Sequence, residues 1–155
     1  MAAVDFFLKI EGIDGESLDS QHPNEIEISS FSWGVTNTGS WQTGGAGNGR
    51  VAEQDFHFTT HTSKASPKLF EACCTGKHID KAVLSVRKAG TVPFEYLHIQ
   101  FEDILISGFA TGGQGLAVPT DQFSLNFSKI EWEYVVQKTG ELDEVTIDFT
   151  QLQVT

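Results

Sequence analysis

The chain has 155 residues, which is enough for one domain with a substantial core, and we expect residues 1–155 to form that single domain. Its 21 acidic side chains against 10 basic ones give a formal net charge of −11. This balance argues against binding to nucleic acid or to anionic lipid, because both need a positive surface. No apolar segment is as long as a membrane span, which argues against membrane insertion. The N-terminal residues lack a basic stretch before an apolar run, so we expect no secretory signal peptide.

An alternating pattern near the N-terminus predicts a first strand that is buried on one face. Every second residue is apolar and polar residues lie between them: Val4, Phe6, Leu8 and Ile10. A period of two is typical of a strand that packs one face on a core. A long polar connection follows at residues 12–25, rich in residues that favour turns.

The second apolar segment changes face partway along. Ile26 and Ile28 occupy even positions, whereas the aromatic residues Phe31 and Trp33 occupy odd ones. A shift of one residue moves the side chains of a strand to its opposite face. We therefore expect a β-bulge near residues 29–30 that bends this strand.

Residues 39–50 contain five glycines and no periodic apolar residues, which indicates a loop. No Gly-Lys-Ser/Thr sequence ends it, so it is not a phosphate-binding loop. Trp41 is unusual in such a segment. Either it folds back onto the barrel or it anchors another protein surface, and the residues alone leave both interpretations open.

One stretch predicts a helix. Ser66 is suited to the N-cap, Pro67 to the first helical position, and Gly76 to the left-handed residue that ends a helix. We expect the helix at about Pro67–Thr75, with an apolar stripe at three- and four-residue spacing: Leu69, Phe70, Cys73 and Cys74. A helix of about ten residues is marginal in water, so this stripe must lie on a sheet.

The two cysteines are neighbours in the sequence, Cys73 and Cys74. On a helix, adjacent side chains point about a quarter-turn apart, and a disulfide between them would distort the backbone. We expect both to be reduced core residues, consistent with folding in a reducing cytoplasm.

The remaining segments predict strands. Phe56 and Phe58 share a face, and the stretch 94–113 alternates until a reversal expected at Glu102–Asp103. The longest strand, residues 123–136, changes face, because its apolar residues are first odd and then even: Phe123, Leu125, Phe127, Ile130, Trp132 and Tyr134. The last strand contains Val145, Ile147 and Phe149.

Long strands that change face are typical of strands shared between two sheets at a barrel corner. We therefore expect a mainly β fold, an antiparallel β-barrel or sandwich of two sheets with one flanking helix.

Charge is distributed unevenly along the chain. The stretch 64–88 is basic and contains Lys64, Lys68, Lys77, Lys81, Arg87 and Lys88. The stretch 131–148 is acidic and contains Glu131, Glu133, Glu141, Asp143, Glu144 and Asp148. Either these are two solvated faces, or the basic patch of one molecule meets the acidic patch of a neighbour.

The sequence offers little for catalysis. Five histidines are scattered, and although His57 and His61 are four apart, their context is strand and loop and no ligand stands at metal spacing. A Gly-x-Ser-x-Gly elbow is absent, and Glu131 and Glu133 fit the polar side of a strand better than a glycosidase pair. We expect a binding or structural protein rather than an enzyme, with no cofactor and no metal.

Five stretches, in their order and spacing, resemble the Hcp family, the tube proteins of the bacterial type VI secretion system. The resemblance covers residues 2–137. It rests on FLKIEGIDGES with a histidine after it, SFSWGVTNTGS, ASPKLFEACCTGKH, VLSVRKAG and FSLNFSKIEWEY. The last segment departs from the family, whose members often end in a strand with Gly-Trp where this chain has Phe149.

This resemblance implies a barrel that assembles into a homohexameric ring. Rings stack into a tube with a spike protein at its tip, a contractile sheath propels the tube outward, and the lumen carries and shelters small effector proteins. The subunits would assemble in the bacterial cytoplasm and leave through the type VI apparatus without a signal peptide. Two alternatives from other classes are a monomeric Hcp-like chaperone or adaptor and, more remotely, a small hydrolase.

The resemblance also assigns roles to residues. Ser32 lies between two core aromatics and would face the lumen. The glycine-rich loop resembles the family's protruding loop and would stack rings through Ser40, Trp41, Gln42, Thr43, Gly44 and Gly45. Because a ring needs contacts between unlike patches, the uneven charge would lie at the ring interface: Lys64, Lys68, Lys77, Lys81, Arg87, Glu131 and Glu133.

Overall fold

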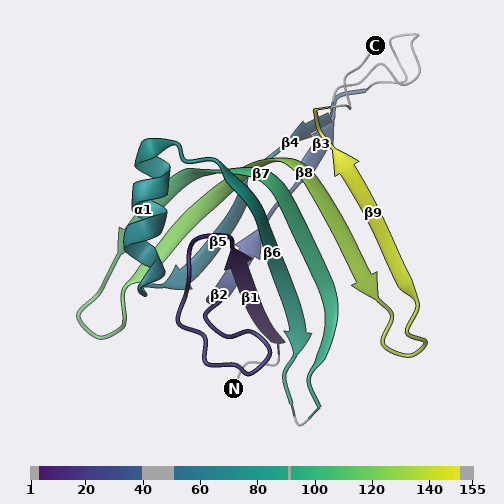
Figure 1. Ribbon diagram of the computed structural model, residues 1–155, viewed down its shortest axis with the longest axis horizontal. Helices are drawn as coiled ribbons and strands as arrows, with labels where there is room; N and C mark the ends of the chain where they lie inside the picture. The colour runs from purple at the N-terminus through teal and green to yellow at the C-terminus, as the bar shows by residue number, and fades with distance from the viewer. Residues whose placement is uncertain (1–3, 40–50, 91, 151–155) are drawn as a thin grey trace.

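Six antiparallel strands close into a barrel in the computed structural model, which describes residues 4–39, 51–90 and 92–150 (Figure 1). The strands are β1 (Val4–Ile10), β2 (Ile26–Ser32), β5 (Phe56–His61), β6 (Ile79–Lys88), β7 (Phe94–Gly112) and β8 (Thr120–Val135). They pair in the order β5-β2-β1-β6-β7-β8, and β8 pairs back with β5 to close the barrel. The predicted β-barrel is confirmed.

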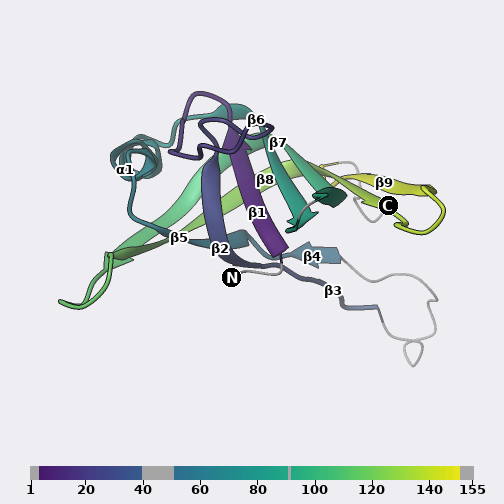
Figure 2. The same ribbon diagram turned by 90° about the horizontal axis from the view of Figure 1, so that it is seen from below.

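Three further strands and one helix lie at the ends of this barrel. β9 (Leu142–Asp148) pairs with β8, while β3 (Val35–Asn37) and β4 (Val51–Glu53) form a separate two-stranded sheet. The helix α1 (Ala65–Thr75) is the one helix among the described residues. Figure 2 shows α1 at one end of the molecule and β9, β3 and β4 at the other.

Aromatic rings fill the barrel interior. Phe56 lies 5.0 Å from Phe58 and 4.9 Å from Phe101, and Phe58 lies 5.2 Å from Phe123, measured between ring centroids. All four side chains are buried, as the shared face of Phe56 and Phe58 predicts. Burying each such side chain stabilises the fold by about 1.5–3 kcal/mol, so these rings are a major part of the core.

The predicted bulge in β2 is confirmed. Its register with β5 shifts between Ile28 and Ser30. The shift turns Phe31 toward the core, where its ring meets Phe6 at 5.0 Å and Phe56 at 5.6 Å. One inserted residue therefore lets both halves of the strand contribute apolar side chains to the same interior.

The reversal predicted at Glu102–Asp103 is wrong, because β7 continues through these residues as one strand. The backbone bends instead: Asp103 has φ of 54°, in the left-handed region where a short polar side chain is tolerated. The hydroxyl of Ser128, on β8, donates to the Asp103 carboxylate at 2.9 Å. This bend explains the change of face, because Phe101 before it and Ile104 after it are both buried.

β8 changes face at the same place and serves two partners on one edge. Phe127 and Ile130 are both buried although they differ in parity. β7 runs along one edge of β8, so the other edge must hold β5, which pairs with residues 120–125, and β9, which pairs with residues 129–135. The shared strand expected at a barrel corner is thus present.

The helix begins at Ala65, not at Pro67, so the prediction of Ser66 as the N-cap is wrong. The cap position is Lys64, and no side chain caps the helix there. The Ser66 hydroxyl instead donates to Asp121, whose carboxylate is completely buried. The same carboxylate accepts from the hydroxyls of Thr62 at 2.9 Å and Thr111 at 2.7 Å. These bonds fasten the start of α1 to β7 and β8.

The buried stripe of α1 is narrower than predicted. Leu69 and Ala72 are buried in the core, whereas Phe70 and Cys74 are exposed and Cys73 is only partly buried. Both cysteines are free, as expected, but Cys74 is not a core residue. The helix therefore presents an aromatic ring and a thiol to solvent.

Gly76 ends the helix as predicted, with φ of 64° and its backbone N–H donating to the Ala72 carbonyl. The helix has 11 residues. Within the described ranges, no helix combines the length and apolar character that crossing a lipid bilayer requires.

Candidate functional site

Four lysines of the basic stretch are exposed, and we call them the basic cluster: Lys64, Lys68, Lys77 and Lys81. Lys64 and Lys68 belong to the start of the helix, Lys77 follows its end, and Lys81 lies on β6. Among the described residues, no ion pair uses any of these lysines. Their charges are therefore available to a partner.

Three glutamates at the opposite end form what we call the acidic cluster: Glu131 and Glu133 on β8 and Glu144 on β9. Their carboxylate oxygens lie within 4.8 Å of one another. Glu133 and Glu144 are directly opposed across the two strands, an arrangement in which like charges destabilise a sheet. A cationic surface would relieve this repulsion, so the cluster is suited to accept basic side chains.

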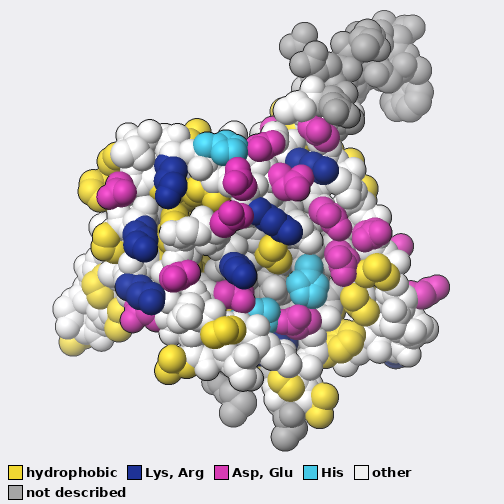
Figure 3. Space-filling model, in the orientation of Figure 1, with side chains coloured by type: hydrophobic (Ala, Val, Ile, Leu, Met, Phe, Trp, Pro, Cys, Tyr) yellow, Lys and Arg dark blue, Asp and Glu magenta, His cyan; other side chains and the backbone are white. Residues whose placement is uncertain are grey.

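The two clusters lie at different ends of one face. In Figure 3 dark blue side chains occupy the end near α1 and the centre, whereas magenta side chains predominate toward β8 and β9. Arg87 does not join the basic cluster. It is 6% exposed and forms ion pairs with Asp5 and Asp19 of its own chain, so it offers little charge to a neighbour.

Ser32 is exposed at the end of β2, where it pairs with His57 of β5. Its neighbours Phe31 and Trp33 are both partly buried against the core. The alternation read from the sequence thus places Ser32 on the non-core face, and its exposure to a lumen stays a prediction. The predicted stacking residues lie outside the described part of the chain: Ser40, Trp41, Gln42, Thr43, Gly44 and Gly45.

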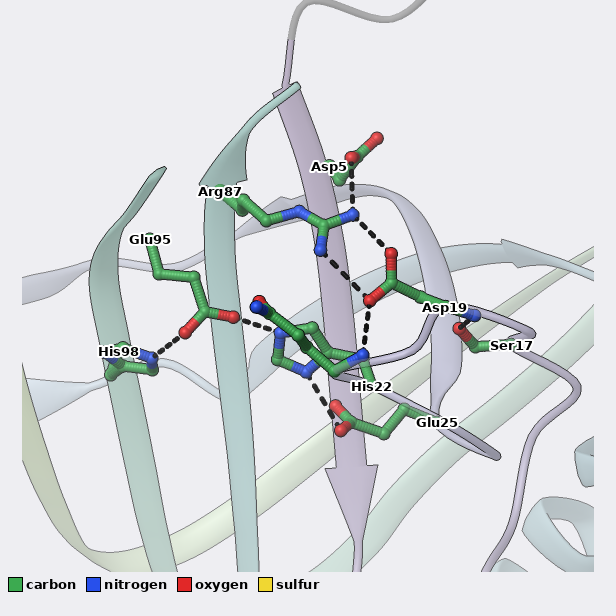
Figure 4. Close-up of polar contacts among 9 residues, drawn as sticks. Asp5, Ser17, Asp19, His22, Glu25, Arg87, Glu95 and His98 are labelled. Carbon is green, nitrogen blue, oxygen red and sulfur yellow. Dashed lines mark hydrogen bonds and ion pairs between the residues drawn. The ribbon is translucent and has the colours of Figure 1, made fainter. Parts of the chain in front are cut away.

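A polar network that the sequence did not predict fastens the connection 12–25 to the outer face of the barrel, and we call it the clasp (Figure 4). Arg87 of β6 is its centre. The guanidinium donates to both carboxylate oxygens of Asp19, at 3.0 and 2.7 Å, and to Asp5 of β1 at 3.0 Å. It also lies 4.9 Å from the centre of the Phe7 ring.

His22 is the second anchor of the clasp. Its ring stacks on Phe7 at 4.5 Å between centroids, and its Nδ1 lies 2.9 Å from a carboxylate oxygen of Glu25. Its Nε2 contacts Glu95 of β7, whose other oxygen lies 3.1 Å from Nε2 of His98. The connection is therefore held by residues that come much later in the chain: Arg87 follows Asp19 by 68 positions, and Glu95 follows His22 by 73.

The clasp shifts the protonation of its members. Hydrogen bonds from Arg87, and then from the backbone of Gln21, lower the pKa of Asp19 to about 2. Burial acts to lower the pKa of His22, but its hydrogen bonds to Glu95 and Glu25 outweigh burial and raise that pKa above 6.5. The two carboxylates thus favour the protonated form of the His22 ring that lies between them.

One signal in the sequence could have indicated the clasp. Phe7 lies between Phe6 and Leu8 and breaks the alternation of the first strand with an apolar residue on the solvent side. An aromatic ring there needs a cover, which His22 of the connection and Arg87 of β6 supply. Phe7 is accordingly 4% exposed.

Comparison with known proteins gives concordant results. Residues 7–134 match a family model described as "Type VI secretion system effector, Hcp". Protein hcp1 of Pseudomonas aeruginosa strain PAO1 is 42% identical over 139 residues, which cover 88% of this chain and 86% of the relative.

Solved structures are similar as well. The crystal structure of Hcp1 from Salmonella typhimurium has a TM-score of 0.84 at 36% identity, covering 98% of this chain and 99% of the other. A type VI secretion system effector from Yersinia pestis has a TM-score of 0.80 at 35% identity, covering 93% and 99%. The family match, the level of identity and the shared fold lead to one conclusion: the chain belongs to the Hcp family of type VI secretion system effectors.

Proposed function

We propose that this protein is the tube subunit of a type VI secretion system, which forms homohexameric rings that stack and are exported. Membership of the Hcp family supports this role. The observation that carries it is the separation of two unpaired charge clusters of opposite sign, the basic cluster near α1 and the acidic cluster on β8 and β9.

A ring of identical subunits needs two different patches that fit each other, because each subunit contacts one neighbour with each patch. The basic and acidic clusters meet this requirement. Exposed ion pairs contribute only about 0–1 kcal/mol each and are screened by salt. They would therefore orient the contact between subunits, while apolar area would hold it.

The rest of the proposal concerns partners. The stacked rings would be surrounded by a contractile sheath and carry a spike protein at the tip, and the lumen would hold small effector proteins against surfaces that include Ser32. The role is structural and needs no catalysis. The barrel is suited to it, because its closure leaves few free strand edges for unspecific pairing.

Sedimentation velocity on the purified protein, followed by negative-stain imaging, tests the proposal. We expect a species of about six times the 17.0 kDa of one chain, visible as rings of uniform diameter. Raising salt should slow the assembly of rings, because it screens the charges that orient the contact, while rings already formed should persist. A protein that stays monomeric at high concentration and low salt would contradict the tube role and favour a monomeric chaperone or adaptor.

A further inference from the structure

Residues 20–23 lie at the end of the connection 12–25 and carry His22, and we call them the tip. The residue before the tip is Asp19, which the two hydrogen bonds from Arg87 fasten to the barrel. A guanidinium keeps its hydrogens at any pH at which proteins fold. This end of the tip is therefore fixed independently of pH near neutrality.

The other end of the tip is fixed by the backbone. The N–H of Asn24 donates to the carbonyl of Ser17 at 2.9 Å, and the carbonyl of Asn24 accepts from the N–H of Gly15 at 2.8 Å. The two arms of the connection are in close contact here, because a Cβ atom at Gly15 would lie 2.4 Å from the carbonyl oxygen of Glu25. The tip is thus a segment of four residues between two fixed points.

Between these points, one side chain holds the tip on the barrel. Ser20, Gln21 and Pro23 are exposed, whereas His22 is 7% exposed. The ring of His22 covers Phe7 of β1 and reaches Glu95 of β7 through Nε2 (Figure 4). The attachment of the tip therefore depends on a group that titrates near neutral pH.

The number of N–H groups on the His22 ring decides how many carboxylates it satisfies. The ring lies between Glu25, at Nδ1, and Glu95, at Nε2. A protonated imidazole donates from both nitrogens, but a neutral one donates from one and presents a lone pair at the other. After loss of the proton, one carboxylate therefore faces a lone pair, and burial of the ring excludes most of the water that would separate them.

The charges around His22 make this loss costly. Its titratable and charged neighbours come from the connection and from four strands: Asp19 and Glu25 of the connection, Asp5 and Lys9 of β1, Glu27 of β2 opposite Phe7, Arg87 of β6, and Glu95 and His98 of β7. Carboxylates predominate, and Arg87 is already paired with Asp19 and Asp5. The proton on His22 is therefore the charge that joins Glu25 of the connection to Glu95 of the barrel.

We propose that His22 is a proton-operated latch: when its ring becomes neutral, the tip lifts from Phe7 and Glu95 while both of its ends stay fastened. The closed latch covers Phe7, and the open latch adds this aromatic ring to the exposed face of the barrel. Burial acts to lower the pKa of His22, but its hydrogen bonds to Glu95 and Glu25 raise that pKa above 6.5. The latch is closed below this pH and opens as pH rises.

Hydrogen exchange of the full-length protein, followed by mass spectrometry between pH 6 and pH 9, tests the latch. Protection is expressed relative to the intrinsic exchange rate at each pH. Peptides that contain the tip should lose up to about tenfold in protection per pH unit above 6.5, until the closed ring has also lost its proton. Peptides from β6 and β7 should lose less, because the barrel stays closed. An equal loss in all peptides, or none in the tip, would overturn the latch.

Glu95→Gln tests the mechanism, because the amide at this position has nearly the same shape and is able to donate to Nε2 of a neutral ring. Glu25 would accept from Nδ1 of the same ring. The tip of this variant should keep at pH 9 the protection that it has at pH 6. Glu102→Gln is the matched control, since Glu102 lies on the same strand and pairs with Lys129 away from the tip. The control should show the pH dependence of the unmodified protein.

Each result decides for or against the latch. Closure of the tip at pH 9 in Glu95→Gln, with opening in the control, supports it. If Glu95→Gln opens with pH as the unmodified protein does, the proton on His22 does not act through Glu95 and the latch is wrong. A tip that is already open in Glu95→Gln at pH 6 would assign its closure to the charge of Glu95 alone. Circular dichroism confirms that both variants are folded, and the pH series on the unmodified protein stands without them.

Discussion

Arg87 and Asp19 are 68 positions apart and are joined by two parallel hydrogen bonds, from Nη1 and Nη2 of the guanidinium to the two carboxylate oxygens. This bidentate geometry is the strongest form of a side-chain ion pair. It connects β6 to the irregular connection 12–25, which has little other regular structure to hold it. The pair is therefore a principal attachment of that connection to the barrel.

Replacing Arg87 by methionine should destabilise the protein by about 1–3 kcal/mol, because the change leaves the partly buried carboxylates of Asp19 and Asp5 without their cation. Urea unfolding followed by circular dichroism measures this. Lys88→Met is the matched control, since Lys88 is exposed and its amine bonds only Gln137. The control should change stability by less than about 0.5 kcal/mol. Equal effects in the two variants would contradict the importance of the clasp.

The protein should lose stability in acid as Asp19 takes up a proton. Its pKa is lowered to about 2 in the folded state from 3.8, so its contribution is complete above about pH 4 and declines as pH falls toward 2. The free energy of unfolding, measured from pH 5 to pH 2, should fall less steeply in Asp19→Asn than in the unmodified protein. Parallel slopes would show that Asp19 does not titrate as proposed.

His22 should produce the opposite dependence on pH. Its folded pKa is raised above 6.5, so its contribution is complete below pH 6.5 and is lost as pH rises through the folded pKa. We expect the free energy of unfolding to decrease between pH 6 and pH 9, and His22→Gln to flatten that decrease. NMR titration of the ring protons gives the pKa directly, and a value below 6.5 would contradict this prediction.

Ser32→Gln should reduce the retention of effectors while rings stay intact. Ser32 is exposed on the non-core face of β2, so a larger side chain there alters a surface without disturbing the core. Co-purification of an effector with the ring measures retention, and sedimentation confirms assembly. Ser29→Gln, also exposed on β2, is the comparison variant. If rings themselves fail in Ser32→Gln, this residue belongs to an interface between subunits.

Trp41→Ala should leave thermal unfolding of the monomer nearly unchanged and weaken the stacking of rings. Five glycines make the segment 39–50 costly to order, on the order of 1 kcal/mol per residue fixed, and burying a tryptophan against a neighbour would offset about 4–6 kcal/mol of that cost. Tube length in negative stain measures stacking. A lower unfolding temperature with unchanged assembly would assign Trp41 to the barrel core.

Patterns of period two predicted most of the barrel, because burial on one face imposes alternation locally. The bulge in β2 and the common face of Phe56 and Phe58 are examples. The start of α1 was predicted wrongly because the Ser66 hydroxyl serves Asp121, which is 55 positions away, instead of the helix end. Rules for helix capping consider only neighbours in the sequence, so they do not predict a hydrogen bond from Ser66 to a distant buried carboxylate.

The same limit applies to the bend in β7 and to the clasp. The change of face at Glu102–Asp103 is compatible with a turn and with a bend within one strand. The bend is stabilised by a contact with Ser128 of the next strand, which the local sequence does not indicate. His22 and Glu95 are 73 positions apart, so the residues near His22 in the sequence do not identify Glu95 as a partner. Phe7, an apolar residue on the solvent side of β1, could have indicated that a cover exists, but not which residues supply it.

The single edge of β8 that holds both β5 and β9 determines how the molecule carries a mechanical load. The hydrogen bonds of an antiparallel pair lie across the strands, so a pull along β8 strains all of them sideways at once instead of opening them one after another. Force applied to β9 would pass along β8 into the seam with β5 as shear, the direction in which a sheet resists most.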